Sequence, residues 1–462
     1  MEKLKIGLLP LYIKLYDDSL SHMRPRIDQF HHILESEFEK RNVEVVSSQV
    51  CRIKQEFAAS IAGFEKEDVD AIVTIHLAYS PSLESSDTLA NTKLPLIILD
   101  TTPTFDYSPE QNPDELDYNH GIHGVQDMCN LLLRNGKEFL IEAGHWEESD
   151  VLDRVVSCVK AAKIAKNIRK ARVGRFGNAF EGMGDFDLPE EILQSTIGIK
   201  TISYNSADGK KLFEQISDRA IDEEIELDKK VFSCSGIDEK VHRSSTRACL
   251  SMRKWIEENQ LTAFTANFME ITGQSDITCM PFMEAGKAMS RGVGYAGEGD
   301  VLTAALVGAL LSTFPETTFT EMFCPDWKNN TIFLSHMGEM NLSLAAEKPV
   351  LKEMEFSFTD ADNPIVAYGR FKSGKAVFIN LAPGKDYSYS LIASDIEMID
   401  VNGEDKMTDS IHGWFRPKIQ ISDFLSQYSR HGGTHHAAIV YGDVMKAMEA
   451  LAKIMNWKLV KI

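Results

Sequence analysis

The sequence predicts an α/β protein that begins with a parallel, doubly wound sheet and ends with antiparallel strands in a barrel or sandwich. Three observations carry this prediction. In the first third of the chain, short continuous apolar runs alternate with helical patterns, as in parallel strands joined by crossover helices. From Thr317 onward, short β-type runs are separated by turn residues. The 462 residues exceed what one core organises and suggest two or three domains.

The elements of the first part follow from apolar spacing. Strands are expected at Leu4–Leu9, Val43–Ser47, Ala71–His76 and Leu94–Asp100, and helices at Ser21–Asn42, Phe57–Glu67, Val125–Leu133 and about Glu147 to Lys170. In such sheets ligands lie beyond the carboxyl ends of the strands. No G-x-G-x-x-G motif follows the first strand, so the sequence does not indicate a dinucleotide.

A second α/β unit is expected from residue 171. Its strands are expected at Ala171–Phe176 and Leu261–Phe268, and its helices near Ser217–Asp228, Asp238–Asn259 and Val301–Ser312. The β-rich remainder predicts strands at Thr331–Ser335, Met354–Phe358, Ile365–Phe371, Ala376–Ala382, Tyr387–Asp400, His435–Tyr441 and Trp457–Ile462, with a helix near Asp443–Met455. The chain thus changes from a helix-and-strand pattern to a strand-rich one.

The composition is that of a globular protein with a strongly acidic balance. Hydrophobic residues make up 43%, charged residues 26%, and the formal net charge is −20. Proteins that bind nucleic acid or anionic membranes neutralise phosphates with a surplus of Lys and Arg, so neither partner is expected. No apolar run approaches the ~20 residues that span a bilayer.

Two features favour the cytoplasm. The seven cysteines are odd in number and dispersed, which is typical of reduced thiols and not of a disulfide framework. The N-terminus has basic residues before apolar ones, but the apolar stretch is short, contains Pro10 and runs into Lys14. A first β-strand therefore explains it better than a signal peptide.

Four segments in the second half each offer a metal ligand beside small residues. They contain Glu298 between two glycines, Glu321 in an apolar β-type run, His336 at the end of a strand, and the pair His435-His436 after two glycines. Carboxylates and imidazoles without close-spaced cysteines suit a divalent cation of the Mn²⁺ type better than zinc in a thiolate cage. A mixed site of this kind leaves room for a substrate's oxygens.

Each of these residues also has a structural interpretation. Asp300 fits the N-cap of the following helix, which leaves the function at this segment to Glu298. A single histidine at a strand end, as at His336, is more often a structural residue. Adjacent side chains on a strand point to opposite faces, so only one of His435 and His436 is expected to ligate, while the other could reach a substrate or pack.

A further pair, His120 and His123, opens the helix at Val125–Leu133. The pair could be a polar cap region, or it could offer hydrogen bonds to hydroxyl groups.

At this point the residues resemble the L-arabinose isomerase family, within the wider L-arabinose/L-fucose isomerase group. The matching stretches follow the family in order and approximate spacing along much of the chain. They are Ile75–Pro81, Asn119–Gly124, Gly144–Trp146, Gly174–Gly177, Ala263–Phe268, Gly294–Asp300, Phe319–Met322, Ser335–Glu339, Ala345–Pro349 and Gly432–His436.

The resemblance implies a fold and a site. The fold has a Rossmann-like N-terminal domain (1–170), a central α/β domain (171–316) and a C-terminal domain with an antiparallel β-barrel (317–462). The site holds Mn²⁺, or another divalent cation such as Co²⁺ or Mg²⁺, on Glu298, Glu321, His336 and His436, with the two glutamates as the acid/base pair. The resemblance also implies a homo-oligomer, a trimer or hexamer, in which His123 serves a neighbouring subunit's site, and it places Phe268 in the substrate pocket.

The chain departs from the family pattern at sugar-reading positions. Leu8–Ile13 replaces a Gly-Ser-Gln-type segment, His120 replaces a Gln, and Phe180 stands where a pocket Met is expected. The chain also stops at Ile462, before the usual family terminus. The metal ligands are retained and the sugar contacts altered. We therefore expect an aldose–ketose isomerase, working through an enediolate or a hydride shift between C1 and C2, whose sugar differs from L-arabinose.

Three function hypotheses follow. The first is a metal-dependent sugar isomerase with His120, His123, Phe180, Phe268 and His435 as substrate-binding residues. The second is a non-catalytic sugar sensor on the same fold, and the third is an epimerase or isomerase of a modified sugar. Retention of both carboxylates favours an enzyme, because a sensor needs no acid/base pair.

Overall fold

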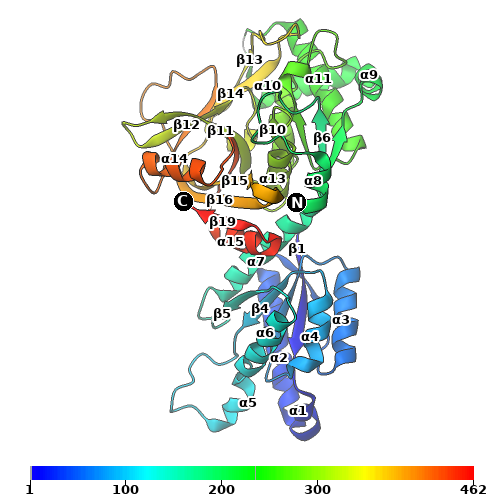
Figure 1. Ribbon diagram of the computed structural model, residues 1–462, viewed down its shortest axis with the longest axis vertical. Helices are drawn as coiled ribbons and strands as arrows, with labels where there is room; N and C mark the ends of the chain where they lie inside the picture. The colour runs from blue at the N-terminus through cyan, green and yellow to red at the C-terminus, as the bar shows by residue number, and fades with distance from the viewer. Residues whose placement is uncertain (1–2, 235) are drawn as a thin grey trace. The chain divides into compact units, whose positions relative to one another are not determined.

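The computed structural model describes residues 3–234 and 236–462, without the side chain of residue 208, and divides into two compact units. The first comprises residues 3–166 together with Lys446–Asn456, and the second comprises Asn167–Met445 together with Trp457–Ile462 (Figure 1). The boundaries expected at residues 170 and 316 stay a prediction.

The first unit is built on a five-stranded parallel sheet of order β2-β1-β3-β4-β5. The strands are β1 (Leu4–Leu11), β2 (Val43–Ser47), β3 (Ala71–His76), β4 (Leu96–Asp100) and β5 (Leu140–Ala143), and the main helices are α2 (Arg24–Lys40), α3 (Lys54–Lys66), α4 (Ser82–Asn91), α6 (Ile122–Arg134), α7 (Val151–Arg169) and α15 (Met445–Met455). Short helices α1 (Lys14–Ser19) and α5 (Leu116–Asn119) complete it. The predicted parallel sheet is confirmed, and its core packs aliphatic strand residues on Phe57 and Phe64.

The second unit contains a four-stranded parallel sheet of order β10-β9-β6-β7. Its strands are β6 (Arg172–Phe176), β7 (Lys200–Ser203), β9 (Ala263–Ala266) and β10 (Gly294–Gly297), and its helices are α8 (Glu190–Thr196), α9 (Ser206–Gln215), α10 (Asp218–Val231), α11 (Glu239–Glu258), α12 (Phe282–Ser290) and α13 (Val301–Leu311). Every residue of α13 is buried, which fits a helix that is apolar on all sides.

A ten-stranded sheet of order β19-β16-β15-β18-β11-β12-β17-β14-β13-β8 makes up the rest of this unit. The strands are β8 (Ser233–Cys234), β11 (Thr317–Asp326), β12 (Thr331–His336), β13 (Val350–Glu353), β14 (Ile365–Arg370), β15 (Gly374–Pro383), β16 (Tyr389–Ile399), β17 (Ile411–Pro417), β18 (His436–Tyr441) and β19 (Lys458–Lys461), and helix α14 (Ile421–Arg430) also belongs here. Three pairs, β8–β13, β14–β17 and β16–β19, are parallel. The sheet is therefore mixed, where the sequence predicted antiparallel strands.

One predicted strand is wrong. Residues 354–358 are not a strand, and the preceding segment Val350–Glu353 forms β13 instead. The Asn363 side chain accepts a hydrogen bond from the Phe356 amide at 2.9 Å. A side chain thus takes the place of the neighbouring strand's carbonyl, with which this amide would pair in a sheet. The sequence also missed β17, in which Gly413 and Pro417 resemble strand breakers.

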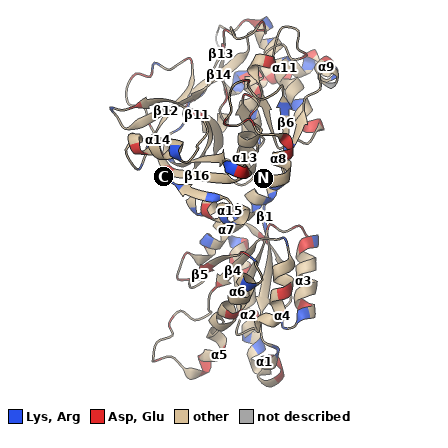
Figure 2. Ribbon diagram, in the orientation of Figure 1, with Lys and Arg blue, Asp and Glu red and all other residues tan. Residues whose placement is uncertain are grey.

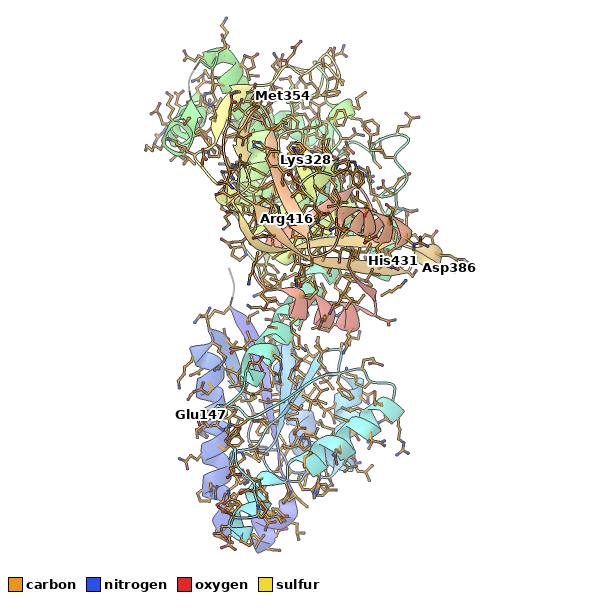
Figure 3. The ribbon with its side chains drawn as sticks, turned by 90° about the vertical axis from the view of Figure 1, so that its left-hand side faces the viewer. Glu147, Lys328, Met354, Asp386, Arg416 and His431 are labelled. Carbon is orange, nitrogen blue, oxygen red and sulfur yellow. The ribbon has the colours of Figure 1, made fainter. Side chains whose placement is uncertain are left out.

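The surface and the cysteines agree with the composition. Lys and Arg positions are dispersed among Asp and Glu positions in each unit (Figure 2). The turn that joins β15 to β16 carries Asp386 outward from its unit (Figure 3). All seven cysteines are free thiols. Within the described ranges, no helix has both the length and the apolar character needed to cross a bilayer.

Candidate metal centre

Glu298 lies in a turn that only glycine neighbours permit. It follows β10 with a φ of 63°, a left-handed value that costs energy for a residue with a side chain. A Cβ on Gly297 would lie 2.7 Å from the His336 ring, and one on Gly299 would lie 2.5 Å from the Asn178 carbonyl. The turn is held by the Glu298 amide, which donates to the Ala266 carbonyl at 3.0 Å. The flanking glycines thus bring the Glu298 backbone against two other segments.

Strand register brings the second carboxylate to the histidines. In the antiparallel pair β11–β18, Glu321 lies opposite His436, and in the pair β11–β12 it lies opposite Ser335, next to His336. Residues directly opposite in such a pair have side chains on the same face, about 5 Å apart. The register therefore explains how Glu321 approaches His436. It does not by itself explain the approach of His336, which follows Ser335 at the last position of β12.

The four residues expected to ligate a metal, together with His435, form two overlapping groups. Ligand atoms of Glu298, His435 and His436 lie within 4.8 Å of one another, and so do those of Glu321, His336 and His436. His436 belongs to both groups, and its Nε2 lies 3.6 Å from a Glu298 oxygen. His435 precedes β18 and its Nε2 lies 3.4 Å from Glu298, so both adjacent histidines lie beside this carboxylate. That only one of them ligates stays a prediction.

Carboxylates anchor the Nδ1 atoms of both central histidines. His336 Nδ1 lies 2.7 Å from Glu339, which also accepts bonds from the Tyr295 hydroxyl and the Gly338 amide. His436 Nδ1 lies 3.0 Å from Asp300. Metal-ligating histidines typically use one ring nitrogen in this way, which fixes the ring and leaves the other nitrogen for the ion.

The surroundings of the His436 Nε2 atom indicate whether these residues can bind a cation. This atom is buried and has no hydrogen-bond partner, although a buried unpaired polar atom costs about 1–3 kcal/mol. It lies 3.6 Å from a Glu298 oxygen, slightly longer than a hydrogen bond, and the ligand atoms of His436 and Glu321 lie within 4.8 Å of each other. A divalent ion between these groups satisfies imidazole and carboxylates together, so the donor set fits.

The two glutamates have different electrostatic environments. Burial raises the pKa of Glu321 above its ordinary value, and the nearby histidines only partly offset this effect. Burial acts in the same direction on Glu298, but the hydrogen bond from His435 and the neighbouring histidines outweigh it and lower the pKa of Glu298. Titratable pairs with diverging pKa values are typical of acid/base sites.

The sequence did not point to Asp185 and Phe186, which contact the imidazoles of His435 and His436. Asp185 accepts bonds from the His435 amide and ring at 3.0 and 2.7 Å, and this pairing raises the pKa of His435 to about 10 against the opposing effect of burial. Phe186 stacks on His436 with ring centroids 5.3 Å apart. Neither residue lies in a recognisable motif. Asp300 was expected only as the N-cap of α13, which it is, through the Thr303 amide at 2.9 Å.

The two phenylalanines expected in the substrate pocket lie together, and one of them contacts the backbone of Glu298. The ring centroids of Phe180 and Phe268 are 5.4 Å apart, and the Phe180 amide donates to the Glu298 carbonyl at 2.9 Å.

His120 and His123 lie in the first unit, at the start of α6. Their rings stack with centroids 5.6 Å apart, and His120 Nε2 lies 3.0 Å from the Tyr16 hydroxyl. Their role in sugar binding stays a prediction.

Comparison with known proteins gives consistent matches. Residues 172–313 match the L-arabinose isomerase central domain and residues 316–458 match the L-arabinose isomerase C-terminal domain. The L-arabinose isomerase of Herpetosiphon aurantiacus is 24% identical over 365 residues, covering 76% of this chain and 72% of the relative. That of Levilactobacillus brevis is 23% identical over 353 residues, covering 74% of each chain, and that of Anoxybacillus flavithermus is 21% identical over 408 residues, covering 86% and 81%.

Proposed function

Because the chain belongs to the L-arabinose isomerase family as a divergent member and is an aldose–ketose isomerase, we propose that it works with a divalent cation held by Glu298, Glu321, His336 and His436. One observation carries the metal proposal. Two histidines are anchored through Nδ1 to Glu339 and Asp300, and the buried Nε2 of His436 faces two carboxylates without a partner. Mn²⁺ is the proposed ion, with Co²⁺ or Mg²⁺ as other candidates.

The proposed reaction moves a carbonyl from C1 to C2 of the sugar. A bound divalent cation supplies polarisation of the carbonyl and stabilises negative charge on the sugar oxygens. Of the two glutamates, one takes the proton from C2 and returns it to C1, and the other moves the hydroxyl proton from O2 to O1, each step contributing about 10²–10⁴-fold. A hydride shift would use the same residues.

The proposed substrate site extends the metal centre. His435, placed by Asp185 beside Glu298, is positioned to donate to a sugar hydroxyl, and Phe180 with Phe268 forms an apolar wall. We further propose that His123 reaches the site of a neighbouring subunit in a cytoplasmic homotrimer or hexamer, with His120 as a further substrate-binding residue. We also propose that the chain divides into three domains at residues 170 and 316. In the third domain, the pairing of β16 with β17 would close the C-terminal strands into a barrel.

Product chromatography tests the function. Mn²⁺-loaded protein is incubated with a panel of aldoses and ketoses, with Glu298→Gln as control. A ketose formed from an aldose by the wild type alone supports the proposal. Tight Mn²⁺ binding without any conversion across pentoses, hexoses and deoxy sugars would overturn it.

A further inference from the structure

The second unit has a cleft at the edge of its parallel sheet, where the connections between strands change direction. From β6 the chain crosses to β7 on one side, and from β9 it crosses to β10 on the other, while β6 and β9 are neighbours. Loops from neighbouring strands that leave in opposite directions open a crevice at the carboxyl edge of the sheet. The segments after β6 and β9 therefore form the walls of a natural ligand site.

Two hollows occupy this crevice. The larger has a volume of about 900 Å³ and the smaller about 300 Å³, and both are lined by Arg175, Asn178 and Glu270. Ligand pockets generally measure ~300–1,000 Å³, a range set by ligands larger than one pentose. The combined crevice is thus larger than a monosaccharide requires.

The larger hollow lies directly beside the metal centre. Phe180 lines it and donates its amide to the Glu298 carbonyl at 2.9 Å. Asn267 also lines it and follows Ala266, which accepts the Glu298 amide. Asp187 lines the hollow as well, and it lies two residues after Asp185, the carboxylate that bonds His435. The segments after β6 and β9 that wall this hollow therefore also contact the segment that carries Glu298.

The lining suits hydroxyl groups and disfavours negative charge. Glu181, Asp187, Glu190 and Glu270 line the larger hollow against the single cation Arg175. Arg175 pairs with Glu190 through Nη2, and its buried Nε has no hydrogen-bond partner. A phosphate or carboxylate would be repelled by this surplus of carboxylates, whereas hydroxyls can donate to them.

The smaller hollow adds an aromatic wall. Tyr204 packs against Phe176 with ring centroids 4.6 Å apart, and Ser206, Ser275 and Asp276 complete the lining with polar groups. Aromatic surface with a few polar groups is the usual composition of a small-molecule site. Glu270 fixes the two loops to each other, since its Oε1 accepts the Asn178 amide at 2.7 Å and the Asn178 side chain at 3.0 Å.

We propose that this crevice is a second saccharide subsite, so that the substrate is an aldose carrying a neutral, hydroxyl-rich extension of about one further sugar ring. This inference rests on the proposed isomerase function, because it places the reducing end at Glu298 and Glu321. The extension lies between the segments after β6 and β9, with Arg175, Glu270 and Tyr204 as its contacts.

The test compares sugars that share a reducing end. Binding to the Mn²⁺-loaded full chain is measured by calorimetry for xylose against xylobiose and for glucose against maltose and lactose, and products are followed by chromatography. We expect at least one disaccharide to bind tenfold more tightly than its monosaccharide and to give the higher kcat/KM. Glucose 6-phosphate should bind more weakly than glucose.

A blocking variant gives the second measurement. Glu181 is exposed at the cleft and Glu257 is exposed on α11 away from it, so Glu181→Trp is compared with Glu257→Trp. Glu181→Trp should reduce the ratio of disaccharide to monosaccharide affinity at least tenfold, and Glu257→Trp should leave the ratio unchanged.

Failure of the subsite and failure of the isomerase give different results. Monosaccharide turnover with no disaccharide preference, or an unchanged ratio in Glu181→Trp, overturns the subsite alone. Disaccharide binding that depends on Glu181, with identical product traces for wild type and Glu298→Gln, supports the subsite and overturns the isomerase. Tighter binding of the phosphorylated sugar overturns the inferred ligand class.

Discussion

Two charged clusters in the second unit, each containing buried carboxylates, differ in how their charges are matched. In the first, which we call the ion-pair network, Arg253, Lys287 and Arg291 face Glu224, Asp228 and Glu284. Arg253 donates hydrogen bonds of 2.8–3.0 Å to the carboxylates of both Glu224 and Glu284. In the second, the candidate metal centre, the carboxylates face imidazoles, and within the described part of the chain no Lys or Arg bonds Glu298 or Glu321.

The difference separates a structural cluster from a functional one. Three cations balance three anions in the ion-pair network, so burial is compensated without any added group. The metal centre leaves the Nε2 of His436 unpaired, and in the described residues its two glutamates face imidazoles and no Lys or Arg. We therefore expect changes in the first cluster to affect stability, and changes in the second to affect chemistry.

The largest effect is expected for Glu298→Gln. Loss of an acid/base carboxylate should lower kcat by about 10²–10⁴-fold, while the melting temperature of the metal-free protein should change little because the amide has the same shape. Glu321→Gln should behave alike. Steady-state kinetics with thermal unfolding measures both quantities, and Glu257→Gln on α11 is the control. Near-normal turnover in both variants would show that the carboxylates are not the acid/base pair.

The ion-pair network should respond in the opposite way to Glu284→Gln. Glu284 is fully buried and bonded to Arg253 and Arg291, so its removal leaves two cations without this partner. Breaking such a pair costs about 3–5 kcal/mol. Urea unfolding should show this loss, whereas kcat of the folded fraction should be retained. The exposed pair Lys254–Glu258 offers Glu258→Gln as a matched control with a change below about 1 kcal/mol. A stable Glu284→Gln protein would show that the network contributes little.

Glu339→Gln tests the support of the metal centre. Glu339 touches His336 and not the proposed ion position, so the ligand set is intact in this variant. Loss of such a supporting carboxylate typically reduces metal affinity about 10–100-fold. Titration with Mn²⁺ measures the affinity, and added Mn²⁺ should restore activity. Unchanged affinity would mean that His336 is oriented by its packing alone.

The smallest effect is a pH dependence of stability in the ion-pair network. Burial raises the pKa of Glu224, but bonds from Arg253 and Lys287 outweigh it and bring the pKa to about 2. A carboxyl with a depressed folded-state pKa stabilises the fold above its ordinary value of 4.5, and this contribution is lost as the pH falls toward 2. The difference in unfolding free energy between wild type and Glu224→Gln should therefore shrink between these values. A difference that grows toward acid pH would contradict the assignment.

Local patterns were enough to predict much of the fold. Ala71–His76 and Val43–Ser47 are strands with the predicted bounds, because a continuous or β-branched apolar run between helices has few alternatives. Asp300 caps α13 as its position before an apolar run indicates. These features depend on neighbours along the chain.

The geometry of the site depended on contacts that no local pattern encodes. Glu321 opposes His436 only through the register of β11 with β18, which the whole sheet determines. Asp185 reaches His435 from 250 positions away in an irregular segment. The ligand types could be predicted, but their arrangement and the carboxylates behind the imidazoles could not.

Asp300 performs two tasks that connect the site to the interior. One oxygen caps α13, the most completely buried helix of its unit, and the other holds His436. An ion that fixes His436 would thereby also hold the start of this helix, and a ligand at a hundred times its dissociation constant adds about 2.7 kcal/mol to folding stability. In a cell, copies that carry the ion would outlive those without it during protein turnover. The abundance of this protein would then follow the supply of the metal as well as the rate of its synthesis.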